Sequence, residues 1–251
     1  MKLTDTTDVL LTELKLYGLK ETFPSRLKEL QAQHWSPSEF LNLCLEDERL
    51  FRENARLLRR LRQAGFPVMA SLENLDFTVP RNLDKNRIRE LSTAQFVTQS
   101  LNILIAGPTG VGKTHLASAL GVAACRQGFP ALFFPLNRLL EKLALTRAQG
   151  RYLSLLRKLS CVPLLVIDDF GLRALTPQQM QDIYDIIDGR VESQTTIVTT
   201  QLPPENWSEV LPDPVLCEAI TDRIVQKAVT LEMVGESYRK KCFRGGHSDP
   251  P

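Results

Sequence analysis

Apolar residues recur at helical spacing through the first 67 residues, and short apolar runs separated by helical stretches follow from residue 101. The first apolar group predicts a helix, and Gly18 suits its end because glycine commonly follows a last helical turn. This group comprises Val9, Leu10, Leu11, Leu14 and Tyr17. A helical N-terminal region is therefore expected.

A second helix is predicted to begin at the sequence Ser-Pro-Ser-Glu, residues 36–39. Ser36 suits the N-cap, Pro37 the first helical position, and Glu39 the reciprocal hydrogen bond of a capping box. We expect this helix to run to about Gln63, because Gly65 and Pro67 follow.

The second predicted helix separates apolar from basic side chains. One side carries Phe40, Cys44, Phe51, Ala55, Leu58 and Leu61, and the other carries Arg49, Arg52, Arg56, Arg59 and Arg60. An arginine-rich face is typical either of a solvated surface or of a surface that binds a phosphate backbone, and it also suits subunit docking. Arg52, Arg56 and Arg59 are the candidate DNA contacts of this helix.

Four short runs, residues 101–106, 131–134, 163–167 and 195–200, are predicted strands. Residues 71–80 are interpreted as an irregular linker and residues 84–97 as a helix. Because continuous apolar runs are typical of strands buried on both faces, the alternation predicts a three-layer α/β domain with a parallel sheet. We expect a helical domain over residues 1–70, the α/β domain over 71–244 and a flexible tail over 245–251.

Composition narrows the class of protein. Of the 251 residues 43% are hydrophobic and 24% are charged, and the net charge is only +2, so any nucleic-acid surface must be local. No apolar run approaches the roughly 18 residues that a membrane span needs. Five scattered cysteines without a CxxC pair argue against a disulfide framework or a zinc site. These features predict a cytoplasmic protein without membrane contact.

The strongest chemical signal is the sequence GPTGVGKT, residues 107–114, which matches GxxxxGK[ST] between a predicted strand and a predicted helix. The backbone N–H groups of such a loop surround phosphate oxygens at a helix N-terminus. Lys113 is expected to reach the β- and γ-phosphates of ATP, and the Thr114 hydroxyl to ligate Mg²⁺. The expected ATP-binding residues are Gly107, Pro108, Thr109, Gly110, Val111, Gly112, Lys113, Thr114 and His115.

A second signal is the apolar strand 164–167, which ends in Asp168 and Asp169. Buried carboxylates need a partner, and Mg²⁺ supplies one for Asp168 through a water molecule, while Asp169 suits a general base. Thr199, Thr200 and Gln201 end the fourth predicted strand before a turn, where a polar side chain can orient water beside the phosphates. Arg223 and Arg239 are candidates for contacts with the γ-phosphate, although a local carboxylate partner would explain each equally well.

Together these motifs resemble the initiator and helicase-loader group of AAA+ ATPases, and more closely the IstB-like helper ATPases of insertion-sequence transposases. The resemblance covers about residues 75–239 and is carried by GPTGVGKTHLA (107–117), LLVIDDFG (164–171), TIVTTQLPPENW (196–207), DPVLCEAITDRI (213–224) and GESYR (235–239). It implies a parallel sheet in the strand order 5-1-4-3-2 with ATP bound between subunits of an oligomer. Relatives usually have Glu where this chain has Asp169 and often Asn where it has Gln201.

The same resemblance assigns roles to single residues. Lys113 and Thr114 correspond to Walker A, Asp168 and Asp169 to Walker B, Gln201 to sensor I, Arg223 to the arginine finger and Arg239 to sensor II. Residues 137–159 correspond to an extra helical element that lines the DNA path in initiator-type ATPases, and we predict two helices there with a break near Gly150. The candidate DNA contacts in this element are Arg138, Lys142, Arg147, Arg151, Arg157 and Lys158.

The function that follows is an ATP-dependent, DNA-binding helper that assembles on duplex DNA with little sequence preference and recruits or stimulates a transposase. A DnaC-like helicase loader shares nearly all of these motifs and would prefer single strands. The same nucleotide motifs would also suit a small-molecule P-loop kinase, or a switch that binds ATP without hydrolysing it.

Overall fold

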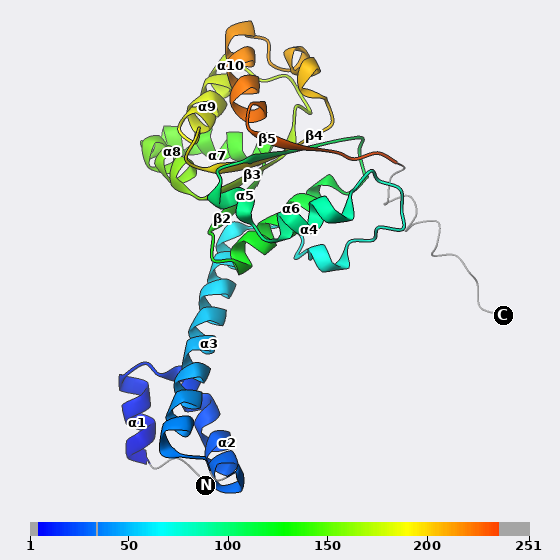
Figure 1. Cartoon of the computed structure of the whole chain (residues 1–251). Helices are drawn as coiled ribbons and strands as arrows, with labels where there is room; N and C mark the ends of the chain where they lie inside the picture. Colours follow the sequence, from blue (N-terminus) through cyan, green and yellow to red (C-terminus); the bar gives the residue numbers. More distant parts are fainter. Residues whose placement is uncertain (1–4, 34, 236–251) are drawn as a thin grey trace, which may run out of the picture. The chain divides into compact units, whose positions relative to one another are not determined.

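The computed structural model describes residues 5–33 and 35–235, and its internal contacts divide the chain into two compact units, Met1–Arg59 and Arg60–Pro251 (Figure 1). The division falls inside one long helix, whereas the sequence placed the domain boundary at residue 70. The candidate Arg239 and the tail 245–251 lie outside the described residues.

The first unit contains α1 (Asp5–Glu13), α2 (Tyr17–Gln33) and most of α3 (Pro37–Ala64). The capping box of α3 is confirmed: the Ser36 amide donates to Glu39 Oε2 at 2.8 Å, and the Glu39 amide donates to Ser36 Oγ at 3.3 Å. The predicted end of a helix at Gly18 is wrong, because Gly18 lies inside α2. A Cβ atom at residue 18 would lie 2.4 Å from Phe51 Cβ, so this glycine permits close packing of α2 against α3.

The second unit is built on a parallel sheet in the order β2-β3-β4-β1-β5, which confirms the predicted strand order. Its strands are β1 (Asn102–Ala106), β2 (Ala131–Pro135), β3 (Leu164–Phe170), β4 (Thr195–Thr200) and β5 (Ala228–Glu232). The apolar runs predicted the first four strands. β5 lies at an edge, Leu231 is its one buried residue, and it lacks a continuous apolar run.

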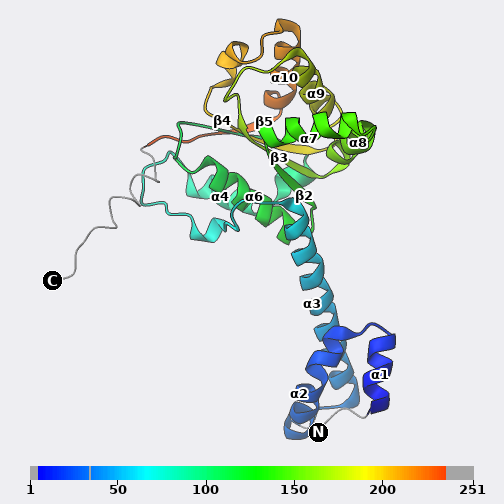
Figure 2. The ribbon, with the colours of Figure 1, turned by 180° about the vertical axis from the view of Figure 1, so that it is seen from behind.

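Helices cover both faces of this sheet (Figures 1 and 2). One face carries α6 (Lys113–Arg126), against which α4 (Lys85–Ser92) packs. The other face carries α7 (Leu136–Ala148), α8 (Tyr152–Cys161), α9 (Pro177–Asp188) and α10 (Pro214–Val225). Short elements complete the unit: η1 (Leu72–Asn74), α5 (Gln95–Thr98) and η2 (Pro204–Glu209).

The core follows the alternation of side chains along the strands. Leu104, Leu165, Ile167 and Val198 belong to a buried cluster with residues of α7 to α10. The strand residues that alternate with them are also fully buried, namely Ile103, Ile105, Val166 and Ile197. The helix predicted over residues 84–97 is interrupted, because Ala94 adopts a left-handed backbone with φ of 55°. Within the described residues, no helix combines the length and the apolar character that a membrane crossing requires.

Candidate nucleotide-binding site

The phosphate-binding loop connects β1 to α6 in the second unit. Gly107 has φ of +150°, and a Cβ atom there would lie 2.2 Å from the Met233 carbonyl oxygen just beyond β5. Gly110 and Gly112 also have positive φ values, and Gly112 is the N-cap of α6. The loop therefore adopts a backbone that side chains would obstruct, with its N–H groups beside a helix N-terminus.

Lys113 points back into this loop. Its Nζ donates to the carbonyl oxygens of Gly107 at 2.7 Å and Pro108 at 2.9 Å. Burial lowers the pKa of Lys113, while the charges of Asp169 and Asp168 oppose that shift. The ammonium group is thus held where a phosphate oxygen could replace the loop carbonyls as its partner.

Thr114, at the start of α6, contacts Asp168 of β3 beneath the loop. Thr114 Oγ1 lies 3.1 and 3.0 Å from the two carboxylate oxygens of Asp168, at the end of β3. Asp168 is buried, and burial raises its pKa, while hydrogen bonds from Thr199 and Thr114 act in the opposite direction. A hydroxyl and a carboxylate at this distance form a set of oxygen donors that suits Mg²⁺.

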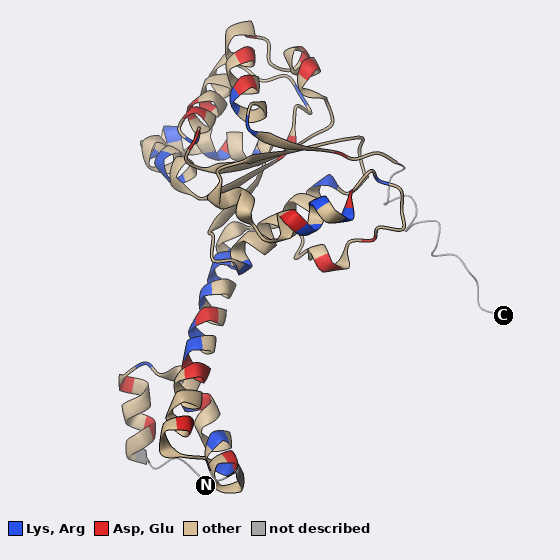
Figure 3. Ribbon diagram, in the orientation of Figure 1, with Lys and Arg blue, Asp and Glu red and all other residues tan. Residues whose placement is uncertain are grey.

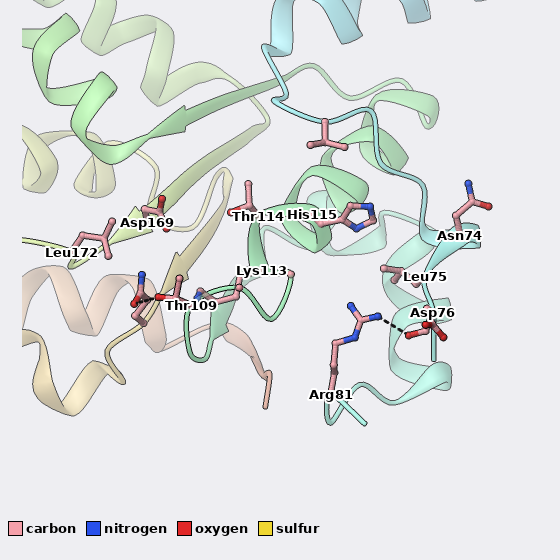
Figure 4. Close-up of a pocket in the computed structure, with 14 residues that line it drawn as sticks. Asn74, Leu75, Asp76, Arg81, Thr109, Lys113, Thr114, His115, Asp169 and Leu172 are labelled. Carbon is pink, nitrogen blue, oxygen red and sulfur yellow. Dashed lines mark hydrogen bonds between the residues drawn. The ribbon is translucent and has the colours of Figure 1, made fainter. Parts of the chain in front are cut away.

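Asp169 and Gln201 line a cavity of about 500 Å³ that extends over the loop, and Figure 4 labels Asp169 among the lining side chains. Thr109 Oγ1 donates to Gln201 Oε1 at 2.6 Å, which ties the loop to the end of β4. Eight of the cavity's lining residues belong to the predicted set, namely Thr109, Gly110, Gly112, Lys113, Thr114, His115, Asp169 and Gln201. The volume falls in the range of small-molecule sites.

The opposite wall of the cavity comes from residues 68–81, which include the segment 71–80 that the sequence predicts as an irregular linker. Val68, Asn74, Leu75, Asp76 and Arg81 line it, and the Arg81 guanidinium donates to the Asp76 carbonyl oxygen at 2.9 Å (Figure 4). Burial and the charge of Arg81 lower the pKa of His115, which favours its neutral form. No motif marks residues 68–81, so only the tertiary structure identifies them as part of the site.

The chain's similarity to known proteins agrees with this geometry. The family model described as IstB-like ATP binding protein matches residues 9–244. The chain belongs to this family. It is 36% identical over 234 residues to the putative insertion sequence ATP-binding protein y4pL of Sinorhizobium fredii, covering 93% of this chain and 96% of that protein. It is also 36% identical over 234 residues to the IS21 putative ATP-binding protein of Pseudomonas aeruginosa, covering 93% and 88% of the two chains.

Solved structures of the DnaC helicase loader and of DnaI share the fold of this IstB-like chain. The DnaC helicase loader superposes with a TM-score of 0.55 at 25% identity, covering 65% of this chain and 96% of that one. DnaI superposes with a TM-score of 0.56 at 22% identity, covering 70% and 93%. The second unit is therefore an AAA+ fold with an ATP-binding role, as the resemblance implied.

Arg223 lies outside the cavity of this IstB-like chain. It is at the end of α10, where Nε donates to Asp188 at 2.9 Å and Nη2 donates to the Tyr184 hydroxyl at 3.2 Å. Its guanidinium carbon lies 4.9 Å from the centre of the Tyr184 ring. The side chain thus has the local carboxylate partner that the sequence allowed, and it does not contact the loop of its own chain.

The element between β2 and β3 consists of two helices, α7 and α8, with Gly150 in the break, as predicted. All six candidate DNA contacts on it have exposed side chains, and Figure 3 shows basic residues along both helices. Arg147 is engaged within the chain: it donates to the buried carboxylate of Asp182 on α9 and stacks 3.9 Å from the Tyr152 ring centre. Lys142 lies over the Phe134 ring at 5.0 Å.

The arginine face of α3 is also partly engaged. Arg49 pairs with Glu46 at 2.9 Å, and Arg52 pairs with Glu48 at 2.7 Å. Arg56 and Arg59 are exposed. Arg60 belongs to the second unit, where its Nε donates to the Cys125 carbonyl oxygen at 3.0 Å.

Proposed function

We propose that this IstB-like chain is a Mg²⁺-dependent ATPase that assembles on duplex DNA and assists a transposase. The observation that carries the proposal is the contact of Thr114 with Asp168, which joins two motifs 54 residues apart at the base of the phosphate-binding loop. A structural turn with a coincidental lysine would not require a buried acidic strand end beneath it. A nucleoside triphosphate with its metal ion accounts for both the loop lysine and the buried carboxylate.

In this proposal the residues divide the work of hydrolysis. The loop amides and Lys113 hold the phosphates, and Thr114 and Asp168 hold Mg²⁺, Asp168 through water. Bound Mg²⁺ would supply positive charge that neutralises the phosphate oxygens. Asp169 accepts a proton from the attacking water, which Gln201 helps to orient, as the bond between the γ-phosphorus and the bridging oxygen breaks. Arg239 stabilises the γ-phosphate of its own subunit. Arg223 stabilises the γ-phosphate of a neighbouring subunit, across the interface between them.

The DNA part of the proposal rests on α7 and α8. Arg138, Arg151, Arg157 and Lys158 are exposed on an element that carries a single acidic residue, Glu141, between residues 137 and 159. Such a surface suits contacts with phosphates rather than with bases. The names of the curated relatives, which place them in insertion sequences, support a transposase as the partner. The DnaC neighbour supports the alternative of a helicase loader.

One experiment tests the nucleotide site and separates these partners. ATP hydrolysis is measured for the full chain without DNA, with duplex DNA and with single-stranded DNA, and again for Lys113→Ala. We expect duplex DNA to stimulate the wild-type chain more than single strands do, and Lys113→Ala to abolish hydrolysis because the phosphates lose their cation. Lys28→Ala, which changes a lysine on α2 in the first unit, is the matched control and should behave like the wild type.

Two results would contradict the proposal. Hydrolysis that survives Lys113→Ala would show that the loop is not the phosphate site. Stronger stimulation by single strands than by duplex DNA would favour the helicase-loader function.

A further inference from the structure

An irregularity in the sheet lies at the Walker B residues. β3 pairs with β4 in parallel through Ile167 opposite Val198, and the register then shifts so that Phe170 lies opposite Thr200. Two residues of β3, Asp168 and Asp169, therefore face the single residue Thr199 of β4. This two-against-one pairing is a β-bulge, and Asp169 within it has a left-handed backbone with φ of 58°.

The Thr199 hydroxyl connects both aspartates. It donates to Asp168 Oδ1 at 2.5 Å and accepts the backbone N–H of Asp169 at 2.9 Å. A threonine hydroxyl has one proton to donate and two lone pairs to accept with, so one side chain can satisfy both contacts. Thr199 is fully buried, so solvent does not compete for these bonds.

Packing alone does not explain a threonine at this position. Its neighbours Ile197 and Val198 are also buried and β-branched, and valine would occupy nearly the same space. What valine lacks is the donor to Asp168 and the acceptor for Asp169. Thr195, at the other end of β4, offers a comparison: it is equally buried, and its hydroxyl donates to the Phe96 carbonyl oxygen instead.

We infer that Thr199 is a positioning residue that fixes the geometry of both Walker B carboxylates, a role that rests on the proposed ATPase function. Its donated hydrogen bond orients the Asp168 carboxylate toward Thr114, where the metal ion is to be held. Its accepted hydrogen bond stabilises the bulge from which Asp169 lines the cavity. One hydroxyl thus positions both Asp168, the proposed metal partner, and Asp169, the candidate base.

Without the hydroxyl, the two aspartates should lose their alignment for separate reasons. Asp168 would lose the donor on β4 that holds its carboxylate opposite Thr114, and it could rotate away from the metal position. The Asp169 amide would lose its partner, and the left-handed backbone would lose the bond that holds it. Removing such outer partners of metal ligands typically reduces metal affinity or activity about 10- to 100-fold.

The test compares Thr199→Val with Thr199→Ser and Thr195→Val in the full chain. Mg²⁺ is titrated at fixed ATP, and both hydrolysis and the binding of a fluorescent ATP analogue are recorded; analogue binding is also measured in EDTA. For Thr199→Val we expect the half-saturating Mg²⁺ concentration to rise about 10- to 100-fold and turnover to fall, with binding in EDTA unchanged. Thr199→Ser keeps the hydroxyl and should restore both values, and Thr195→Val should match the wild type.

The outcomes separate this inference from the proposed function. If Thr199→Val keeps the wild-type Mg²⁺ dependence and turnover, or if Thr199→Ser is as defective as valine, the positioning role is wrong while the ATPase function stands. If the wild type binds no Mg²⁺·ATP at all, both fall. If it binds without hydrolysing, the Mg²⁺ dependence of analogue binding still decides the role of Thr199. Should the valine variant not fold, Thr199→Ala carries the same expectation.

Discussion

Among single residues, Gly107 connects the phosphate-binding loop to β5, a contact that the motif itself does not reveal. The space for a side chain at this position is filled by the Met233 carbonyl oxygen, 2.2 Å from where a Cβ atom would lie. Gly128, after α6, offers a comparison because it also has a positive φ, of 97°, but no atom lies within 4 Å of its Cβ position.

Gly107→Ala should therefore displace the loop and abolish ATP binding. Gly128→Ala should retain ATP binding and cost only about 1 kcal/mol of stability, because its strain is confined to the backbone. Calorimetric titration with ATP and urea unfolding of both variants measure these effects. Normal ATP binding by Gly107→Ala would mean that the segment just after β5 moves aside at little cost. The close contact with Met233 would then not hold the loop in place.

The residues of the site divide into those that a motif marks and those that only the fold brings in. Lys113, Thr114 and Asp168 could be predicted because phosphate and metal chemistry requires those residue types at a fixed spacing beside a strand. Thr199 was visible only as a polar strand end, since its partners lie 30 and 31 residues away and depend on the register of β3 with β4. Arg81 gave no local signal, because it reaches the cavity from an irregular segment.

Among the elements, those whose ends are set by local chemistry were the most predictable. The start of α3 follows from the capping box of Ser36 and Glu39, which needs no tertiary contact. Gly18 was misread because a glycine required for close packing and a glycine that ends a helix look alike in sequence. The edge strand β5 was missed because an edge position does not demand an apolar run.

The ion pair between α2 and α3 gives a prediction about the stability of the first unit. Arg26 donates to both carboxylate oxygens of Asp47 at 2.8 Å, and the Asp47 side chain is only 9% exposed. The hydrogen bonds from Arg26 lower the pKa of Asp47. Because the folded-state pKa lies below the unfolded value of about 3.9, this stabilisation is complete above that value and is lost as pH falls through the folded pKa.

Asp47→Asn should thus destabilise the first unit at neutral pH by about 1.5–3 kcal/mol, the range for hydrogen bonds to charged groups. It should also reduce the loss of stability that the wild type shows on acidification below about pH 4. Glu46→Gln, which removes only the exposed pair with Arg49, is the matched control and should change stability little. Amide hydrogen exchange in α2 and α3 at several pH values reports the effect. An unchanged acid sensitivity in Asp47→Asn would show that another carboxylate controls it.

At the scale of the whole molecule, the proposed self-association concerns the nucleotide site and Arg223. The cavity, the loop and both Walker B aspartates belong to the second unit, so one chain contains the residues proposed to hold ATP. Arg223 lies apart from that cavity, and Asp188 and Tyr184 fix its side chain. An arginine held in this way is already oriented, which suits a contact made in a neighbouring subunit.

Arg223→Ala should accordingly leave ATP affinity of the isolated chain unchanged but reduce hydrolysis at least about 10-fold and weaken ATP-dependent self-association, since a finger acts on the transition state from another subunit. Light scattering with a non-hydrolysable ATP analogue and steady-state phosphate release measure the two effects.

A second variant, Asp188→Ala, distinguishes an arginine finger from an arginine that only ties α9 to α10, because it removes the ion pair but keeps the guanidinium of Arg223. If Arg223 acts only as a tether for α9 and α10, both variants should lose the same stability and neither should change self-association. If Arg223 acts across an interface, Asp188→Ala should retain most of the hydrolysis, because the group that meets the phosphate is still present.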